Sequence, residues 1–503
     1  MKDFLDRFVG NISASAIMTS VFFWSWFDLV PFSTLVGDVA GAGSSPLGLA
    51  ASMAVSVVTL LVYAKSRRLL EHALSPWGFA AACLLAGSLG TALTYAGSLA
   101  GSAPLLAVAT MLVGVFEGAG IATIGPLITC QGKTNALVHM AVCLPVNIVF
   151  VLLGLFLQPR AGVALCILLP MLSALSFVVY LNRGRNDRTI RQALTPAGSA
   201  RRPTGRRHEL AGYATVLLLV TVSFGVVNVA TQFSAGDGAG WDRASFVPLV
   251  IRAAAAASVF LAYVFWSRQP YSILVAALTL MVLGLLALGI VPAASRGSAP
   301  APYWVVVAGY AVFDLLIWAM IVIVHRGSGA PLARFVCLAY ALDQLGNCVG
   351  TVLGIGLVAL GGDALALGCG VLGALVALSA LVTLSRPGAI MGDLRTVVVE
   401  PVAPAQGGLA SSQGACAPTP PTGGAAAIHE DSVSAIGSRY FLTEREREIL
   451  SLLVAGRTAP FISEQLGVSQ NTVKTHVRHI YAKLDIHDRQ ELIDLASEPQ
   501  DMR

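Results

Sequence analysis

Residues 441–496 read FLTEREREILSLLVAGRTAPFISEQLGVSQNTVKTHVRHIYAKLDIHDRQELIDLA, and this stretch decides how the chain is organised. Thr443 and Glu446 have the spacing of a reciprocal capping box, in which each side chain accepts a hydrogen bond from the other residue's backbone N–H. A helix is therefore expected to begin directly after Thr443. Gly456 interrupts it, and Pro460 stands where a first-turn proline opens a second, shorter helix.

A third helix is predicted from about Gln470 to Leu484, after a turn in which Gly467 ends the second helix and Ser469 caps the next. Its apolar residues form one stripe: Val473, Val477, Ile480 and Leu484. Its basic and polar residues lie on or near the opposite face: Lys474, Thr475, Arg478, His479 and Lys483. Such a face suits entry into the DNA major groove, where guanine edges accept hydrogen bonds from Arg and Lys. A fourth helix follows, with Asp488 as its cap.

Periodicity alone also fits any small module of three or four helices whose charged face is only solvated. The spacing of particular residues goes further, because residues 442–492 resemble the LuxR-type (NarL/FixJ-type) DNA-binding domain over its whole length. The matching positions are Leu442, Thr443, Arg445, Glu446, Gly456, Leu466, Gly467, Val468, Ser469, Thr472, Val473, Lys474, His476, Ile480, Lys483, Leu484, Arg489 and Glu491.

The resemblance implies that this module binds double-stranded promoter DNA through its third helix, as a homodimer whose usual contact surface would be the fourth helix. Base contacts are implied for Lys474, Thr475 and Arg478, phosphate contacts near Thr472, and the candidate DNA-binding set also includes His476, His479 and Lys483. Ala459 and Phe461 depart from the Asn and Glu that the family often carries. Residues 440–497 hold seven Lys and Arg against eight Asp and Glu, so attraction to phosphate must come from the third helix.

The rest of the chain is of another kind. Of its 503 residues, 56% are hydrophobic and 12% charged, whereas about a quarter are charged in soluble domains. The apolar residues come in blocks long enough to cross a lipid bilayer. Twelve spans are predicted, at residues 11–31, 46–64, 76–97, 103–125, 135–157, 161–181, 210–232, 244–266, 270–291, 302–325, 334–358 and 364–385. We interpret the first as a signal anchor that is not removed.

The predicted fold class is all-α: a twelve-helix transmembrane bundle followed by a four-helix helix-turn-helix domain. The bundle covers residues 1–387, with halves 1–182 and 209–387 separated by a basic loop at 183–208. This 6+6 layout resembles the major facilitator architecture in topology. The loop's arginines suit anionic lipid headgroups better than DNA. Residues 388–438 are rich in Ala, Gly and Pro and are predicted to form a disordered linker spanning about 40 Å, and residues 439–503 form the DNA-binding domain.

The loops predict orientation. With the N-terminus inside, cytoplasmic segments carry seventeen Lys and Arg and outer loops carry three. An even number of spans returns the C-terminus to the cytoplasm, the side on which a DNA-binding module has a use. The predicted location is therefore the inner (cytoplasmic) membrane, with both termini cytoplasmic.

Charged residues inside the spans are candidates for ligand sensing, because burying charge in lipid is costly. They are Asp28, Glu117, Arg252, Asp314 and Asp343, with Asn147, Gln344 and Asn347 as polar neighbours. Glu117 and Asp314 each follow a Phe, in the fourth and tenth spans. One interpretation is a central polar site with Arg252 facing an acid; the other is that these groups join helices by hydrogen bonds, which we favour for Asn147.

Motifs for catalysis are not found: the sequence shows no phosphate loop, zinc-binding His-Glu pair or nucleophile elbow, and its eight cysteines lack metal-ligand spacing. We expect no enzymatic activity, cofactor or metal. The leading hypothesis is a membrane-bound, one-component transcriptional regulator whose bundle senses a small-molecule ligand or membrane signal. The alternatives are a secondary transporter with a regulatory tail, and a tail that binds protein instead of DNA.

Overall fold

The computed structural model describes residues 13–31, 46–130, 133–157, 159–182, 190–195, 206–232, 247–265, 270–290, 301–325, 330–385, 443–454 and 459–466, and six further residues of the C-terminal module, 472, 473, 476, 477, 480 and 484. The chain divides into two compact units, Met1–Val402 and Ala403–Arg503. The predicted linker at 388–438 and most of the basic loop at 183–208 lie outside the described residues.

The first unit is a bundle of helices. Its N-terminal half comprises α2 (Ala14–Leu29), α4 (Pro46–Lys65), α5 (Arg67–Ala73), α6 (Pro76–Ala82), the π-helical η1 (Cys83–Ser88), α7 (Leu89–Ala100), α8 (Ala103–Thr129), α9 (Lys133–Phe156) and α10 (Pro159–Leu181). Its C-terminal half comprises α12 (Arg206–Gln232), α13 (Val247–Phe265), α14 (Pro270–Ile290), α15 (Ala301–His325), α16 (Leu332–Leu360) and α17 (Gly362–Ser385). The all-α prediction is confirmed for the part of the chain that the structure describes.

Each of the twelve predicted spans overlaps one of these helices. Within the described residues, ten are long and apolar enough to cross a membrane: α4, the continuous segment α6–η1–α7, α8, α9, α10, α12, α14, α15, α16 and α17. The described part of α2 has 16 residues, and the apolar part of α13 covers Val250–Val259. A multi-pass membrane bundle is thus confirmed, and the crossing of α2 and α13 stays a prediction.

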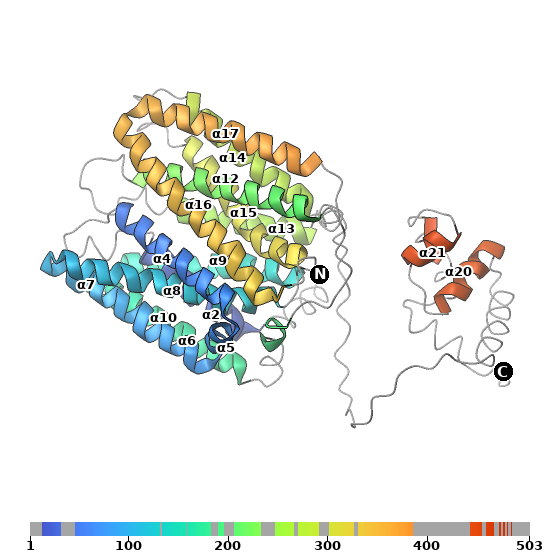
Figure 1. Ribbon diagram of the computed structural model, residues 1–503, viewed down its shortest axis with the longest axis horizontal. Helices are drawn as coiled ribbons and strands as arrows, with labels where there is room; N and C mark the ends of the chain where they lie inside the picture. The colour runs from blue at the N-terminus through green and yellow to red at the C-terminus, as the bar shows by residue number, and fades with distance from the viewer. Residues whose placement is uncertain are drawn as a thin grey trace. The chain divides into compact units, whose positions relative to one another are not determined.

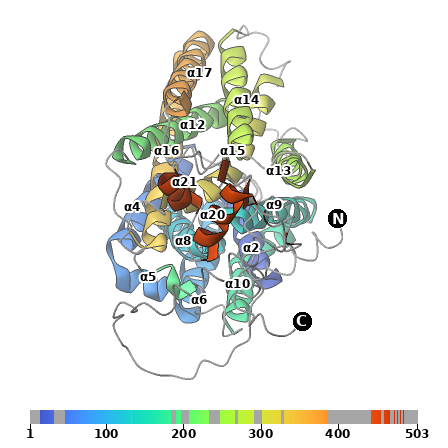
Figure 2. The ribbon, with the colours of Figure 1, turned by 90° about the vertical axis from the view of Figure 1, so that its right-hand side faces the viewer.

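The two halves repeat one packing pattern, counting the segment α6–η1–α7 as one helix. In each half the first long helix contacts the fifth and sixth, the fourth contacts the second and third, and the sixth contacts the third. The halves lie side by side in both ribbon views, blue to teal for the first and green to orange for the second (Figure 1, Figure 2). Between them α4 contacts α16 and α13 contacts α9, which is the same pairing of a second with a fifth helix. The predicted 6+6 organisation is therefore present in the packing.

Pairs of glycines on one face of a helix allow neighbouring helices to approach one another closely. Gly114 and Gly118 of α8 lie against Ser52 and Thr59 of α4. On α16, Gly346 and Gly350 lie in the same way against Thr221 and Val222 of α12. Small residues four apart let two backbones approach in lipid, where van der Waals packing replaces the hydrophobic effect as the force that holds helices together.

Local capping sets both ends of the span formed by α6, η1 and α7. The hydroxyl of Ser75 accepts a hydrogen bond of 3.0 Å from Gly78 N, with Pro76 in the first turn of α6. At the other end of this span, Gly101 takes a φ of 58°, which is open to glycine at little cost. Ser102 N then donates to Gly97 O at 3.0 Å, which closes α7 with a Schellman motif.

The second unit contains α20 (Glu444–Val454) and α21 (Ala459–Leu466), followed by described residues of the third helix. A small core unites them, made of Ile449, Leu450, Leu453, Ile462, Val473, Ile480 and Leu484, with Val477 packed against it. The apolar stripe predicted for the third helix is confirmed, since all four of its residues belong to this core or pack on it. The fourth helix lies outside the described residues.

Candidate functional site

The first helix of the C-terminal module starts with the predicted capping box. Thr443 N donates to Glu446 Oε2 at 2.8 Å, and Glu446 N donates to Thr443 Oγ1 at 3.3 Å. The Thr443 hydroxyl also donates to the same Glu446 carboxylate at 3.0 Å. The box fixes the start of α20, whose buried residues anchor the core of the module.

Arg445 has a structural role that sequence reasoning did not assign. Its Nη2 donates to Leu466 O at 2.9 Å, and Nη1 pairs with Glu448. Leu466 is the last residue of α21, where carbonyl groups have no partner within the helix. Arg445 therefore ties the start of α20 to the end of α21, directly before the turn that leads into the third helix.

Of the predicted DNA-binding residues, the structure describes Thr472, which is exposed, and His476, which is half-buried. Five others lie outside the described residues: Lys474, Thr475, Arg478, His479 and Lys483. Their neighbours Val473, Val477 and Ile480 are directed into or against the core. The period of 3.6 residues per turn predicts that Lys474 flanks this stripe and that Arg478 lies on the side away from it. The DNA-facing surface remains a prediction that the core geometry favours.

In the bundle, Asp28 and Arg252 form an ion pair between the two halves. Arg252 Nη1 of α13 lies 2.7 Å from Asp28 Oδ1 of α2. The second oxygen, Asp28 Oδ2, accepts a hydrogen bond of 2.7 Å from Asn147 Nδ2 of α9, and Ser25 Oγ donates to Asn147 Oδ1 at 2.7 Å. The sequence prediction that Arg252 faces an acid is borne out. So is the interhelical role of Asn147, which connects α9 to α2.

Asp314 and Asp343 extend this network to α15 and α16. Arg252 interacts electrostatically with Asp314 as well as with Asp28, and Asp314 in turn interacts with Asp343. All three aspartates are buried, and the Arg252 side chain is 20% exposed. Four of the five candidate sensing residues therefore meet at the junction of the two halves.

Glu117 lies apart from the other four. It is buried on α8 beside Ser52 of α4, and neither of its carboxylate oxygens has a hydrogen-bond partner within the described part of the chain. In the repeated packing, α8 against α4 corresponds to α15 against α13. Asp314 thus has a cation on the facing helix, where Glu117 has a serine.

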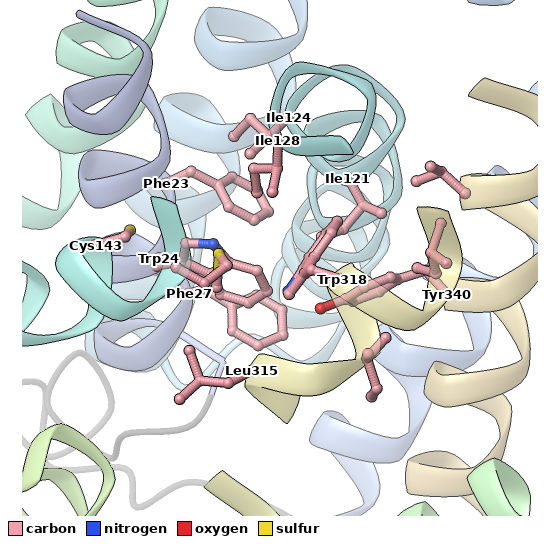
Figure 3. Close-up of a cluster of buried hydrophobic side chains, with 14 of the residues drawn as sticks. Phe23, Trp24, Phe27, Ile121, Ile124, Ile128, Cys143, Leu315, Trp318 and Tyr340 are labelled. Atoms are coloured by element: carbon pink, nitrogen blue, oxygen red, sulfur yellow. The ribbon is translucent and has the colours of Figure 1, made fainter. Parts of the chain in front are cut away.

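Aromatic side chains beside the acids were not assigned a site from the sequence. Figure 3 shows Trp24 of α2, Trp318 of α15 and Tyr340 of α16 gathered in one cluster. The ring centroids of Trp318 and Tyr340 are 4.7 Å apart, and those of Trp24 and Trp318 are 6.3 Å apart. The signal that could have found them is the spacing of each ring three or four residues from an acid, which puts both on one helix face.

Several buried polar atoms near this cluster have no hydrogen-bond partner among the described residues. They include the indole nitrogens of Trp24 and Trp318, Asp343 Oδ1, Gln344 Oε1 and Asn347 Oδ1. Buried polar groups are nearly always paired, so a concentration of unpaired ones marks a place where another molecule, water or ligand, belongs. His139 of α9, also missed from the sequence, has its Nε2 2.9 Å from Ser20 Oγ and joins α9 to α2.

Both units resemble known proteins. Residues 441–496 match the family model of bacterial regulatory proteins, luxR family. The chain is 50% identical over 48 residues to the transcriptional regulatory protein LiaR of Bacillus subtilis, which is 10% of this chain and 23% of that protein. It is 46% identical over 48 residues to the probable transcriptional regulatory protein NarL of Mycobacterium tuberculosis, 10% and 22% of the respective chains. The chain thus spans about a quarter of the length of these relatives.

The bundle resembles a solved transporter. The human organic anion transporter MFSD10 matches with a TM-score of 0.53 and 15% identity, over 75% of this chain and 99% of that chain. At this identity the likeness shows the fold alone. The chain therefore joins a membrane bundle with the fold of this transporter to a C-terminal module that matches the luxR family of bacterial regulatory proteins.

Proposed function

We propose that this chain is a membrane-bound transcriptional regulator in which the bundle senses a small molecule or membrane signal and the C-terminal domain binds promoter DNA. The observation that carries the proposal is the joining of the two folds in one chain, with a hydrophobic core that unites α20, α21 and described residues of the third helix in its own compact unit. The positive-inside pattern supports placing both termini in the cytoplasm. The domain then lies on the side where it meets DNA, and a homodimer on the promoter follows from the family resemblance.

A sensing mechanism requires two bundle states that bind the signal with different affinity. The Asp28–Arg252 pair suits such a role because its two residues come from different halves. A rearrangement of the halves would separate the ions or bring them together. We infer that the signal acts on this junction and that its effect reaches the DNA-binding domain through residues 386–442.

Genome-wide crosslinking of the tagged full-length protein in its native cells tests the DNA-binding part. The wild type is compared with the double variant Lys474→Ala, Arg478→Ala. We expect discrete peaks that the double variant loses, since these side chains are proposed to contact base edges. Absence of peaks over several growth conditions would contradict the proposal and favour a tail that binds protein.

A secondary transporter with a regulatory tail is the second candidate, and the 6+6 packing with intramembrane acids favours it. Proteoliposomes separate the two functions. Accumulation of a substrate inside vesicles against its gradient would establish transport, whereas binding without accumulation supports a receptor. The first outcome combined with promoter peaks would assign both activities to one chain.

A further inference from the structure

Each of three helices in the bundle places aromatic rings about one helical turn from an acid. The groups are Trp24 with Asp28 on α2, Tyr310 and Trp318 with Asp314 on α15, and Tyr340 with Asp343 on α16. Residues three or four apart share a helix face. Since the rings of Trp24, Trp318 and Tyr340 contact one another (Figure 3), the three faces converge on the junction of the halves.

Acidic side chains outnumber basic ones at this junction among the described residues. Three carboxylates, Asp28, Asp314 and Asp343, meet one guanidinium, that of Arg252. Asp28 has both oxygens satisfied, by Arg252 and by Asn147. Asp314 shares the same guanidinium, whereas Asp343 interacts with Asp314 and Asn347. An uncompensated buried carboxylate is costly, so such a group either takes up a proton or pairs with an added cation, and this junction offers room in its charge balance for one.

Unpaired acceptors point to the same conclusion. Asp343 Oδ1 and Asn347 Oδ1 are one turn apart on α16, both residues are 4% exposed, and neither atom has a hydrogen-bond partner in the described part of the chain. Ammonium N–H groups would satisfy them. The faces of the neighbouring rings supply a second attraction, because a cation over an indole or phenol ring within about 6 Å is stabilised by its quadrupole.

We propose that Trp24, Asp314, Trp318, Tyr340 and Asp343, called here the aromatic–acid cage, bind an organic ammonium ion with an apolar or aromatic body. This inference rests on the proposed function and names the chemical class of its signal. An inorganic cation fits less well, since Na⁺ and Ca²⁺ prefer shells of oxygen ligands and the cage walls are largely aromatic. A neutral ligand would leave the carboxylates uncompensated.

Isothermal titration calorimetry on the purified full-length protein in detergent at neutral pH tests the cage. The probes are two cations, 2-phenylethylamine and its N,N,N-trimethyl derivative, with 2-phenylethanol as the neutral analogue of similar shape. We expect at least one cation to bind about tenfold or more tightly than the alcohol. Equal binding of cation and alcohol, binding of neither cation, or displacement of the cation by NaCl at equal concentration would overturn the proposal.

Substitutions of cage residues test whether the cation binds in the aromatic–acid cage. Asp343→Asn keeps the size of the side chain and removes its charge, so we expect affinity for the cation to fall about tenfold or more while affinity for the alcohol stays the same. Trp318→Leu should weaken cation binding, and Trp318→Phe should restore part of it. The matched control is Glu117→Gln, a buried carboxyl of the same bundle outside the cage. If it weakens binding as much as Asp343→Asn, the cation does not bind in the cage.

The titration contains no DNA, so it is independent of the promoter crosslinking. Cation binding without promoter peaks would leave the cage established and remove the regulatory function. Promoter peaks with no cation binding would support the regulatory function and overturn the aromatic–acid cage.

Discussion

Arg252 of α13 and Asp28 of α2 are joined by an ion pair of 2.7 Å, although 224 residues separate them in the chain and they belong to different halves of the bundle. Asn147 holds the other oxygen of the carboxylate, so three helices meet at one side chain. A buried ion pair contributes little net stability, but removing one partner leaves a charge without compensation. The pair therefore connects the two halves only while both of its charged residues are present.

Breaking this pair from one side is expected to destabilise the bundle. Arg252→Met leaves Asp28 charged and buried, and we expect a loss of about 3–5 kcal/mol, seen as a lower thermal midpoint of the detergent-purified protein. The double variant Arg252→Met, Asp28→Asn should recover most of this loss. Arg67→Ala, which breaks the exposed pair with Glu71, should cost about 1 kcal/mol or less. Equal effects at both pairs would contradict a buried connection.

Asp314→Asn is expected to change the response to the signal while leaving the DNA affinity of the C-terminal domain unchanged. Asp314 lies beside Arg252 in the bundle, whereas the DNA-binding core belongs to the second compact unit. Promoter occupancy of the full-length variant, measured across growth conditions, reports the first effect. Binding of the fragment containing residues 403–503 to the same promoter reports the intrinsic DNA affinity for comparison. Promoter occupancy that equals the wild type under every growth condition, or that falls by the same factor under all of them, would refute a sensing role for Asp314.

The capping box predicts a modest stability effect in the DNA-binding domain. Thr443→Ala removes the acceptor for Glu446 N and the donor to the Glu446 carboxylate. We expect the free energy of unfolding of the fragment 403–503 to fall by about 1 kcal/mol in urea titrations. Thr443→Ser keeps the hydroxyl and should stay near the wild type. No difference between the two variants would mean that the cap is not formed in solution.

Two glycines of α16 offer a matched test of helix packing. A Cβ at Gly350 would collide with the backbone of Val222 on α12, whereas a Cβ at Gly356 would meet nothing within 4 Å. Gly350→Ala should therefore overpack this contact and lower the free energy of unfolding by about 1–3 kcal/mol. The loss would be seen as a lower thermal midpoint. Gly356→Ala makes the same chemical change on the same helix and should be neutral or slightly stabilising. A reversed order would show that α12 and α16 do not pack as described.

Lys474→Ala should weaken binding to the strongest crosslinked promoter fragment by about 1–3 kcal/mol. The ratio of the affinities for this promoter and for unrelated DNA should fall as a result. Fluorescence anisotropy with both DNAs measures this difference. Thr472→Ala, at an exposed position proposed to contact phosphate, should weaken binding to both DNAs alike. If Lys474→Ala lowers affinity for both DNAs equally, Lys474 contacts the backbone and not a base.

The sequence by itself determined the helices, the two-part organisation and the start of the first helix of the C-terminal module. These features follow from local rules: apolar blocks of bilayer length, the reciprocal spacing of Thr443 and Glu446, and the stripe from Val473 to Leu484. It also singled out the buried charges, because charge is rare in a span. Only the tertiary structure decided that Asp28 pairs with Arg252, that Glu117 stands apart, and that Trp24, Trp318 and Tyr340 meet. The physical reason is that such contacts depend on which faces of distant helices turn toward one another, and helical periodicity fixes a face within one helix but not its partner on another.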